Sequence, residues 1–310
     1  MKVIQTVAGM EAERERLEGT VGLVPTMGYL HEGHLSLVRR ARRDCGRVVV
    51  SIFVNPAQFG PQEDFDRYPR DPERDLRLLA AERADFVFMP PVDEMYPPGP
   101  SAALRTGFDQ WVEISGPLSE RLEGAARPGH FRGVTTIVAR LFRVVRPHRA
   151  YFGQKDAQQL RVIRRMVTEQ GLPVEVIAAP TVREPDGLAM SSRNVYLSPE
   201  QRVAALVLSR SLRLARQMVM EQGVSDADRV RGKLSNLIRA QPGVELEYVS
   251  ISDEDTFEEV NTIDRPVLAL LAARAGATRL IDNVVLVPKG VAVPEALREI
   301  IFSPGGQASA

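Results

Sequence analysis

The sequence is poor in the residues that form disulfide frameworks and zinc sites. Among its 310 residues there is a single cysteine, Cys45, and there are only 4 histidines. One thiol cannot form an internal disulfide, and it makes no zinc site alone. Cys45 falls on the apolar face of a predicted helix, so we expect it to be a packed core residue.

The chain also lacks an excess of charge of either sign, and it lacks long apolar runs. Its 40 basic and 40 acidic side chains give a formal charge of +0. A dedicated nucleic-acid-binding protein more often carries a basic excess, so we expect no nucleic-acid partner. No apolar run approaches the ~20 residues that a membrane span needs, and Met1–Gly19 has no apolar signal-peptide core. We therefore expect a cytoplasmic protein with no membrane association.

What the sequence does have is a regular alternation of apolar strands and amphipathic helices. Hydrophobic residues make up 44% and charged residues 26% of the chain, which is typical of globular proteins. The alternation predicts a doubly wound, Rossmann-like α/β domain, whose parallel sheet binds ligands at the carboxyl ends of its strands. The predicted strands are 22–25, 47–54, 85–89, 150–152 and 174–179, and the predicted helices are 34–44, one starting at Pro72, 133–145 and 156–170.

The pattern changes near Thr181, where a smaller α+β domain is predicted. Ser198 and Gln201 are placed to form a capping box with Pro199 at the first helical position. Two helices are predicted to about 221 and from 225 to about 240, followed by antiparallel strands at 245–253, 267–273 and 278–287. We assign 1–180 to the Rossmann-like catalytic domain, 181–288 to the C-terminal domain and 289–310 to a tail expected to be disordered. The irregular stretch 95–129 is expected to provide a mobile flap in its second half.

The densest signal for function follows the first predicted strand. A turn containing Gly28 leads to His31 and His34, where a helix begins. The first N–H groups of a helix are unpaired and its dipole favours an anion, so this order of elements suits phosphate. Histidines at a helix start can also simply cap it or face solvent, and zinc would need ligands that no other His/Cys cluster supplies. We interpret the segment as part of a nucleoside triphosphate site and expect no metal ligands in it.

Two further segments carry groups suited to phosphate. Gly153–Asp156 follows a strand, and Lys155 offers a compact positive charge, although Asp156 could be only an N-cap. Met190–Asn194 offers two hydroxyls and a guanidinium, although by itself it could be a polar turn. Together with the histidine segment, these two favour a triphosphate site.

Amide side chains after the second strand suit a small polar substrate. Asn55 and Gln58 could hydrogen-bond such a molecule, and Gln159, one helical turn beyond Lys155, could contact the same ligand. Amides are often only surface residues. The loop Arg127–Arg132 could add cations over the site or be merely solvated.

Taken in order, these segments resemble the pantoate–β-alanine ligase family, within the HIGH-motif nucleotidyltransferase superfamily. The resemblance is dense from about Val21 to Leu197 and continues beyond by layout. The HEGH segment alone indicates only the superfamily, which also contains class I aminoacyl-tRNA synthetases. The matching segments are PTMG (25–28), HEGH (31–34), SIFVNP with QF (51–56, 58–59), RYPR (67–70), EG with RPGHFRG (123–124, 127–133), FG with KD and QQL (152–153, 155–156, 158–160) and SSRN (191–194).

The resemblance implies an ATP-dependent condensation of pantoate with β-alanine, giving pantothenate, AMP and diphosphate through a pantoyl adenylate, in the synthesis of the coenzyme A precursor. It also implies Mg²⁺ and a homodimer. By motif position His34 is the proton donor, and His31, Lys155 and Arg193 join it in stabilising the phosphate charge. Gln58 and Gln159 would hold pantoate, with Gln58 also near β-alanine. The implied ATP-site residues are Met27, Gly28, Tyr29, Leu30, His31, Glu32, Gly33, His34, Gly153, Gln154, Lys155, Asp156, Val182, Met190, Ser191, Ser192 and Arg193.

Two features depart from the family pattern. Ala157 stands where an aromatic residue is common, and the chain after about 287 is longer than usual. Two other functions fit the residues alone: a nucleotidyltransferase with a different acceptor, and a nucleotide-binding module without catalysis. Diphosphate release with different acid and amine substrates distinguishes the three.

Overall fold

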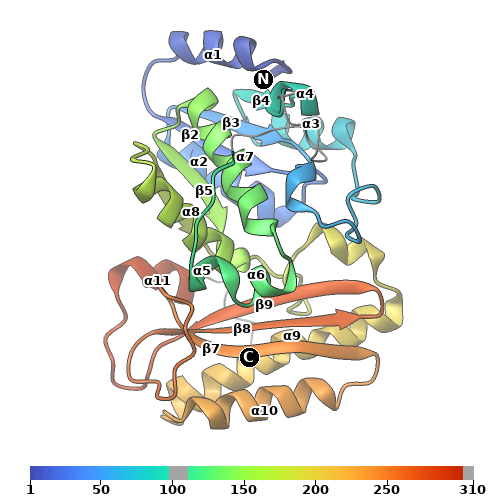
Figure 1. Ribbon diagram of the computed structural model, residues 1–310, viewed down its shortest axis with the longest axis vertical. Helices are drawn as coiled ribbons and strands as arrows, with labels where there is room; N and C mark the ends of the chain where they lie inside the picture. Colours follow the sequence, from blue (N-terminus) through green and yellow to red (C-terminus); the bar gives the residue numbers. More distant parts are fainter. Residues whose placement is uncertain (98–110, 303–310) are drawn as a thin grey trace. The chain divides into compact units, whose positions relative to one another are not determined.

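The computed structural model describes residues 1–97 and 111–302, which form two compact units (Figure 1). Unit 1 comprises Met1–Gly153 and Gln158–Ala178, and unit 2 comprises Gln154–Ala157 and the chain from Ala179 onward. Residues 98–110 of the expected irregular stretch and residues 303–310 of the expected tail lie outside the described part. Within the described residues, no helix combines the length and apolar character needed to cross a membrane.

A six-stranded sheet forms the centre of unit 1, in the order β1-β4-β3-β2-β5-β6. Strand β2 pairs in parallel with β3 and with β5, and β4 pairs in parallel with β3 and with β1. The buried, nearly continuous apolar sequences of β2 and β3 suit a sheet that is covered on both faces. The predicted doubly wound fold is thus confirmed. The strands are β1 Lys2–Ile4, β2 Val21–Thr26, β3 Arg47–Ile52, β4 Phe86–Phe88, β5 Arg149–Gly153 and β6 Glu175–Ala179.

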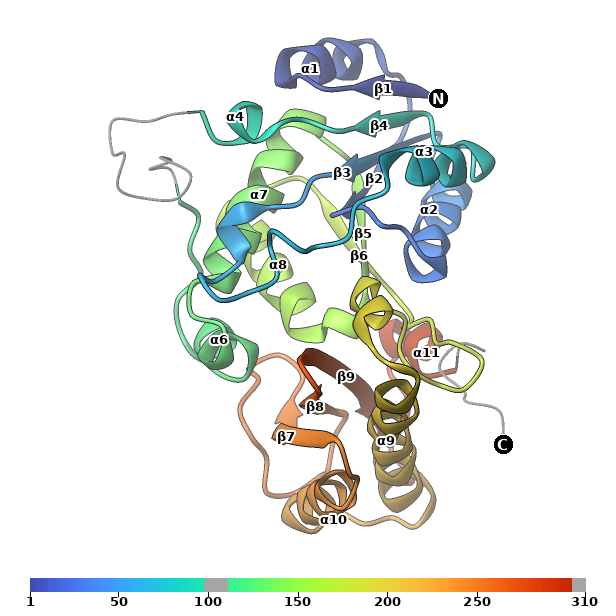
Figure 2. The ribbon, with the colours of Figure 1, turned by 90° about the vertical axis from the view of Figure 1, so that its right-hand side faces the viewer.

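Helices cover both faces of this sheet, with α2 and α3 on one side and α7 and α8 on the other (Figure 2). Helix α3 starts as predicted, because Asp71 accepts a hydrogen bond from the Arg74 N–H and Pro72 takes the first position. Cys45 is buried at the C-terminal cap of α2, which confirms its expected place in the interior. The helices are α2 Glu32–Asp44, α3 Pro72–Ala81, α7 His130–Val145 and α8 Ala157–Glu169.

The strand order identifies where a ligand would be expected. From β2 the chain proceeds to β3 on one side of the sheet, whereas from β5 it proceeds to β6 on the other side. In open α/β sheets, ligands bind outside the carboxyl ends of the strands at this reversal of strand order. Here the two strands end at Thr26 and Gly153, so the segments that follow β2 and β5 leave the sheet at that point.

Several elements of unit 1 were not predicted. Strand β1 has three residues, and only Met10 of α1 is buried, so neither gives a periodic apolar signal. The expected flap contains two short helices, α5 and α6. Gln158 holds this segment by donating to the Leu118 and Arg121 carbonyls and accepting from the Glu123 N–H. The unpredicted elements are α1 Val7–Arg16, η1 Pro56–Gln58, α4 Val92–Met95, α5 Pro117–Glu120 and α6 Glu123–Ala126.

Unit 2 is built on three strands that pair antiparallel, as predicted, and the structure adds their order β7-β8-β9. Helices α9 and α10 pack against each other and against this sheet. The predicted capping box is present at the start of α9, where Ser198 and Gln201 exchange hydrogen bonds with each other's backbone N–H groups. The elements are η2 Gln154–Asp156, η3 Ser192–Tyr196, α9 Pro199–Arg216, a π-helical turn η4 Gln217–Glu221, α10 Ala227–Arg239, β7 Val244–Asp253, β8 Val267–Ala275, β9 Thr278–Leu286 and α11 Glu295–Phe302.

Helix α11 corrects the expectation of a disordered tail. Leu297 and Ile301, four residues apart, are both buried, which places them on one face of the helix. Leu297, Ile300 and Ile301 stand at the i, i+3 and i+4 spacing of a helix, so the sequence held a short signal that the expectation of a disordered tail overlooked.

Candidate functional site

The predicted site residues divide between the two units. Unit 1 carries Met27–His34, Gly153, Gln58 and Gln159. Unit 2 carries the remainder, which are Gln154–Asp156, Val182 and Met190–Arg193.

The turn after β2 uses left-handed backbone at two successive residues. Gly28 has φ +80° and Tyr29 has φ 51°, a conformation that costs a non-glycine residue free energy. Asp75 holds this turn, because its carboxylate accepts from the N–H groups of Tyr29 at 2.7 Å and Leu30 at 2.8 Å. Burial raises the pKa of Asp75, while the two N–H groups oppose that rise.

Arg74 supports the same turn from its outer side. Its Nη1 donates to the Leu30 carbonyl at 2.8 Å, and its guanidinium lies 5.5 Å from the centre of the Tyr29 ring. Sequence reasoning missed both Arg74 and Asp75. In the sequence they are ordinary charged residues in the first turn of a helix, and no spacing relates them to the histidine segment.

His31 and His34 form a reciprocal cap at the start of α2. His31 is the N-cap and its Nδ1 accepts from the Gly33 N–H at 3.2 Å. The His34 Nδ1 in turn lies 3.4 Å from the His31 N–H, and the ring centroids are 4.0 Å apart. A neutral imidazole that accepts at Nδ1 carries its proton on Nε2. Both rings are therefore set in the tautomer that donates from Nε2.

This geometry corrects one part of the phosphate argument. The N–H groups at the helix start were expected to be unpaired, but Gly33 donates to His31 Nδ1 and His34 donates to the His31 carbonyl. The Tyr29 and Leu30 N–H groups are likewise taken by Asp75. These four backbone N–H groups of the segment therefore have partners within the protein.

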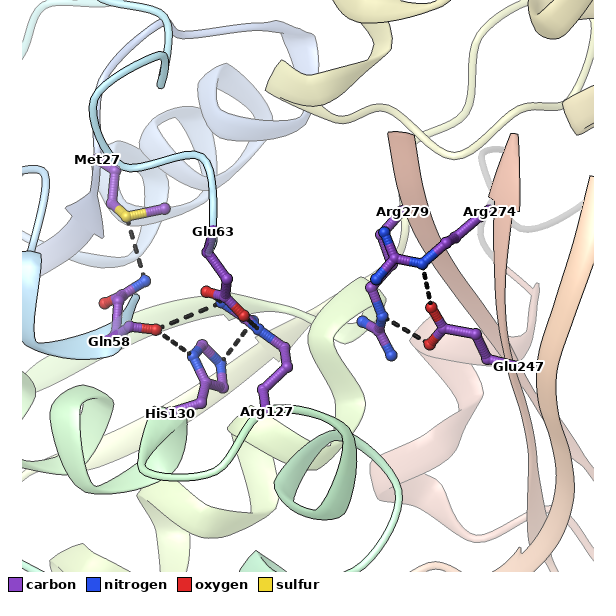
Figure 3. Close-up of polar contacts among 8 residues, drawn as sticks. All are labelled: Met27, Gln58, Glu63, Arg127, His130, Glu247, Arg274 and Arg279. Carbon is purple, nitrogen blue, oxygen red and sulfur yellow. Dashed lines mark hydrogen bonds and ion pairs between the residues drawn. The ribbon is translucent and has the colours of Figure 1, made fainter. Parts of the chain in front are cut away.

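The carboxamide of Gln58 has a defined orientation. Its Oε1 accepts from Asn55 Nδ2 at 3.1 Å, so its Nε2 points the opposite way and lies 3.2 Å from the Met27 Sδ (Figure 3). Asn55 is itself fixed, since its Oδ1 accepts from the Tyr96 hydroxyl at 2.7 Å and its Nδ2 also donates to the Gly133 carbonyl. Both amide atoms of Asn55 thus have partners within the protein, and its expected contact with a substrate stays a prediction.

The backbone of Gln58 is held by a second set of groups. His130 Nδ1 lies 2.9 Å from the Gln58 carbonyl, and Arg127 Nη1 lies 3.1 Å from His130 Nε2 (Figure 3). Arg127 also makes two 2.7 Å contacts with the carboxylate of Glu63. Burial, together with the Arg127 charge, lowers the pKa of His130 to about 4. Two residues of this loop are therefore a paired arginine and a histidine whose pKa is low, and the expectation that the loop adds cations over the site stays a prediction.

In unit 2, Lys155 lies in the single turn η2. Its Nζ is 3.5 Å from Asp156 Oδ1, and its side chain is about one-fifth exposed. The neighbouring Gln154 is buried. This turn places an ammonium group directly after the carboxyl end of β5, as the sequence predicted.

The other predicted residues of unit 2 come together through a local hairpin. The Met190 N–H donates to the Val182 carbonyl at 3.0 Å, next to a bridge between Arg183 and Ala189. Ser191 then caps η3 by accepting from the Arg193 N–H at 3.3 Å. Two positions eight residues apart in the sequence are thus neighbours in the structure.

Hydrogen-bond donors dominate the predicted residues of each unit. Imidazole and amide N–H groups are present in unit 1, and ammonium, guanidinium and hydroxyl groups in unit 2. Such groups suit phosphate and carboxylate oxygens. Over residues 1–97 and 111–302, no group of three or more His, Cys, Asp and Glu side chains is arranged to hold a metal ion.

Comparison with known proteins gives a consistent result. The family model described as pantoate-beta-alanine ligase matches residues 2–285. A pantothenate synthetase from Roseiflexus sp. (strain RS-1) is 56% identical over 92% of this chain and 99% of its own length. A pantothenate synthetase from Thermotoga petrophila is 54% identical over 92% of this chain and 100% of its own length.

Solved structures agree with these relatives. The crystal structure of pantothenate synthetase from Thermus thermophilus is 51% identical, with a TM-score of 0.86, and covers 93% of this chain and 100% of that one. A pantoate-beta-alanine ligase from Francisella tularensis, complexed with beta-gamma ATP and beta-alanine, is 31% identical with a TM-score of 0.75. It covers 92% of this chain and 97% of that one.

Proposed function

Because the chain belongs to the pantoate-beta-alanine ligase family, it condenses pantoate with β-alanine at the expense of ATP, and we propose that it does so through a pantoyl adenylate. The match of one family model to residues 2–285 carries the assignment of the reaction. The donor-rich segments after β2 and β5 support the adenylate route, because those neighbouring strands flank the reversal of strand order.

In the first step of the proposal, a pantoate carboxylate oxygen attacks the α-phosphorus of ATP and diphosphate leaves. Negative charge then builds on the phosphate oxygens. The Nε2–H groups of His31 and His34, with Lys155 and Arg193 from the other unit, would stabilise that charge. His34 would be the proton donor. Diphosphate release requires no covalent bond to the enzyme.

Pantoate would be positioned by Gln58 and Gln159. The Gln58 Oε1 is occupied by Asn55, so Gln58 would present its Nε2–H group to a pantoate oxygen. When pantoate and ATP are both held in position, this positioning supplies much of the rate enhancement, because the reaction needs no enzyme nucleophile.

In the second step, the β-alanine amine attacks the acyl carbon of the adenylate. The C–N bond forms, the C–O bond to the phosphate breaks, and AMP leaves with that oxygen. The amine gives up a proton in the process. Gln58 would also lie near β-alanine, and the segment containing α5 and α6 would keep water from the adenylate.

Mg²⁺ would accompany ATP in this proposal. This ion usually binds through phosphate oxygens and water with one or two carboxylates, and it would neutralise the charge of the leaving diphosphate. The described residues contain no larger acidic cluster for it. The predicted consequence is that diphosphate release requires added Mg²⁺ and stops when EDTA is in excess.

We also propose that the enzyme is a homodimer and acts in the cytoplasm, where ATP is available. Light scattering during gel filtration should give twice the 34.3 kDa chain mass. Cell fractionation should place the activity with the cytoplasmic enzymes. A monomer mass, or activity retained in the envelope fraction, would contradict the respective proposal.

Labelled pantoate tests the adenylate route directly. With ¹⁸O in the pantoate carboxylate, one labelled oxygen should appear in the phosphate of AMP, because the bond to phosphorus is formed by that oxygen. Mass spectrometry of the nucleotide product measures this. ADP as the product, or label in inorganic phosphate, would exclude the adenylate.

A further inference from the structure

In unit 2, two successive buried residues of β9 contact both segments that we assign to ATP. Asp282 and Asn283 are 3% and 4% exposed. They lie near the middle of β9, opposite Leu271 and Leu270 of β8. A buried carboxylate and a buried amide cost folding free energy unless they are fully hydrogen-bonded, so their partners are informative.

Asn283 holds the backbone of the lysine turn. Its Nδ2 donates to the carbonyls of Gln154 at 3.0 Å and Lys155 at 2.8 Å. Its Oδ1 lies 3.5 Å from the Gln154 Nε2. Because both hydrogens of one amide are used on successive carbonyls, the position and direction of the Lys155 main chain are fixed relative to β9.

Asp282 holds the base of the hairpin that carries Val182 and Met190. Arg183 makes a two-pronged contact with its carboxylate, at 2.6 Å and 2.9 Å, and also donates to the Gly187 carbonyl. The Arg183 side chain is only 12% exposed. Planar, two-pronged pairs of this kind fix geometry as well as adding energy.

The two contacts are also joined to each other. The Asn283 N–H donates to Asp282 Oδ1 at 2.8 Å, so a displacement of one side chain is transmitted to the other. The dipeptide Asp282-Asn283 therefore holds both the turn that contains Lys155 and the hairpin that contains Val182 and Met190. These two segments are about 30 positions apart, and the dipeptide follows the second by about 100 positions. Asp282 and Asn283 can therefore affect ATP binding through these segments without contacting ATP themselves.

We propose that Asp282 and Asn283 are positioning residues for ATP, which set Lys155 and the Val182–Met190 hairpin in register with each other. This rests on the proposed roles of those segments in binding ATP. The small sheet of unit 2 thereby takes part in the adenylation step, beyond completing the fold.

Three variants test the proposal. Asn283→Ala removes both carbonyl contacts, and Asn283→Asp keeps the size of the side chain but places a carboxylate against two carbonyl oxygens. The matched control is Glu247→Gln in β7, which disturbs ion pairs with Arg274 and Arg279 in the same sheet (Figure 3). Steady-state kinetics of diphosphate release and ATP binding by calorimetry are the measurements, with circular dichroism as the folding control.

Both Asn283 variants should raise the KM for ATP, or lower kcat for adenylation, by about tenfold or more. The KM for pantoate should stay within about twofold, because Gln58 and Gln159 belong to the other unit. The control should match the wild type. For Asn283→Asp, activity relative to wild type should rise on acidification, because a protonated carboxyl can donate one hydrogen bond again.

A double-mutant cycle separates positioning from general loss of structure. If Asn283 acts through Lys155, the Asn283→Ala change should weaken ATP binding little further in a Lys155→Ala background. Additive losses, equal losses for ATP and pantoate, or wild-type kinetics in folded Asn283 variants would overturn the inference. Failure of the proposed function is a different result: the wild-type enzyme itself would then release no AMP or diphosphate.

Discussion

The two histidines show how one residue can serve the fold and the chemistry with different atoms. In His31 and His34 the Nδ1 atoms cap the helix, and that contact fixes the proton on Nε2. The capping interpretation and the functional interpretation are therefore compatible. The cap selects the tautomer that a phosphate oxygen requires.

A substitution at His31 can separate the capping role of its Nδ1 atom from the proposed role of its Nε2–H group. Asparagine can replace the Nδ1 acceptor of His31, because it is among the best N-cap residues, but it has no counterpart of Nε2–H. The His31→Asn variant should keep its unfolding free energy within about 1 kcal/mol of wild type. Adenylation should fall about 100-fold, as for the loss of one charge-stabilising donor.

Thermal melts and diphosphate release measure the two quantities. His31→Ala serves as the comparison, because it removes both atoms and should lose both the cap and the activity. Wild-type adenylation by folded His31→Asn would show that the Nε2–H group has no catalytic role.

A second prediction concerns the hydroxyl that orients Asn55. Tyr96→Phe removes one donor to Asn55 Oδ1 and leaves the Asn55 amide held only by Ala57 and Gly133, so the partner that orients Gln58 is less firmly fixed. A lost hydrogen bond of about 1 kcal/mol corresponds to a roughly fivefold rise in the KM for pantoate. Initial-rate kinetics at saturating ATP measure it.

Tyr151→Phe is the matched control for this change. Tyr151 is also buried in unit 1, but its hydroxyl lies against Cys45 at 3.3 Å rather than against Asn55. Its pantoate KM should not change. If the two variants behave alike, the hydroxyl of Tyr96 does not act through Gln58.

Among the elements of unit 1, α7 and η1 approach each other very closely. A Cβ atom on Gly133 would lie 2.3 Å from the Ala57 carbonyl oxygen, so only glycine fits there. One turn earlier, His130 contacts the Gln58 carbonyl from the first residue of α7. Helix α7 thereby holds the η1 turn, which carries Gln58, at two backbone positions, Ala57 and Gln58.

This contact predicts a pH dependence of stability. The pKa of His130 is lowered from 6.5 to about 4, so the native state resists protonation at this residue. The unfolded chain binds a proton at this histidine below a pH of about 6.5, whereas the native state does so only near pH 4. Protonation therefore favours unfolding, and the native state loses stability as the pH falls from about 6.5 to about 4. At pH 4 the loss from this group reaches about 3 kcal/mol.

His130→Asn should flatten the dependence in that window, because asparagine can still donate to the Gln58 carbonyl but does not titrate. Urea unfolding between pH 4 and pH 7 for both proteins gives the difference. Parallel curves for the two proteins would contradict a neutral, buried His130.

At the scale of the whole molecule, two units with separate apolar cores each carry part of the proposed ATP site. A short piece of chain, Gln154–Ala157, belongs to unit 2 although it lies between two segments of unit 1. The chain thus passes from β5 into the lysine turn and back into α8. We therefore expect ATP binding to slow amide exchange in both units.

Hydrogen exchange tests whether segments of both units bind the same ATP molecule. With a non-hydrolysable ATP analogue, amide exchange should slow at 27–35 in unit 1 and at 154–157 and 182–193 in unit 2. Adenosine, which lacks phosphates, should protect these peptides less. Protection confined to one unit would mean that the segments do not meet on one triphosphate.

The sequence by itself determined the order of strands and helices, because apolar spacing and capping residues act over a few positions. It also determined the antiparallel strands of unit 2 and the place of the histidine pair at the start of α2. It could not predict β1 or α1, because each buries too few side chains to give a periodic signal. The short apolar spacing of α11 was present in the sequence but was overlooked.

Only the tertiary structure decided which residues support the site. Asp75 and Asn283 hold their segments through side-chain contacts to backbone groups 45 and 128 positions away, and any residue has those backbone groups. Burial is the main cause that lowers the pKa of His130, and although Arg127 stands only three positions earlier, no local pattern shows how deeply the histidine is buried. Sequence patterns reveal chemistry that is local along the chain. Positioning and ionisation depend on neighbours that only folding brings together.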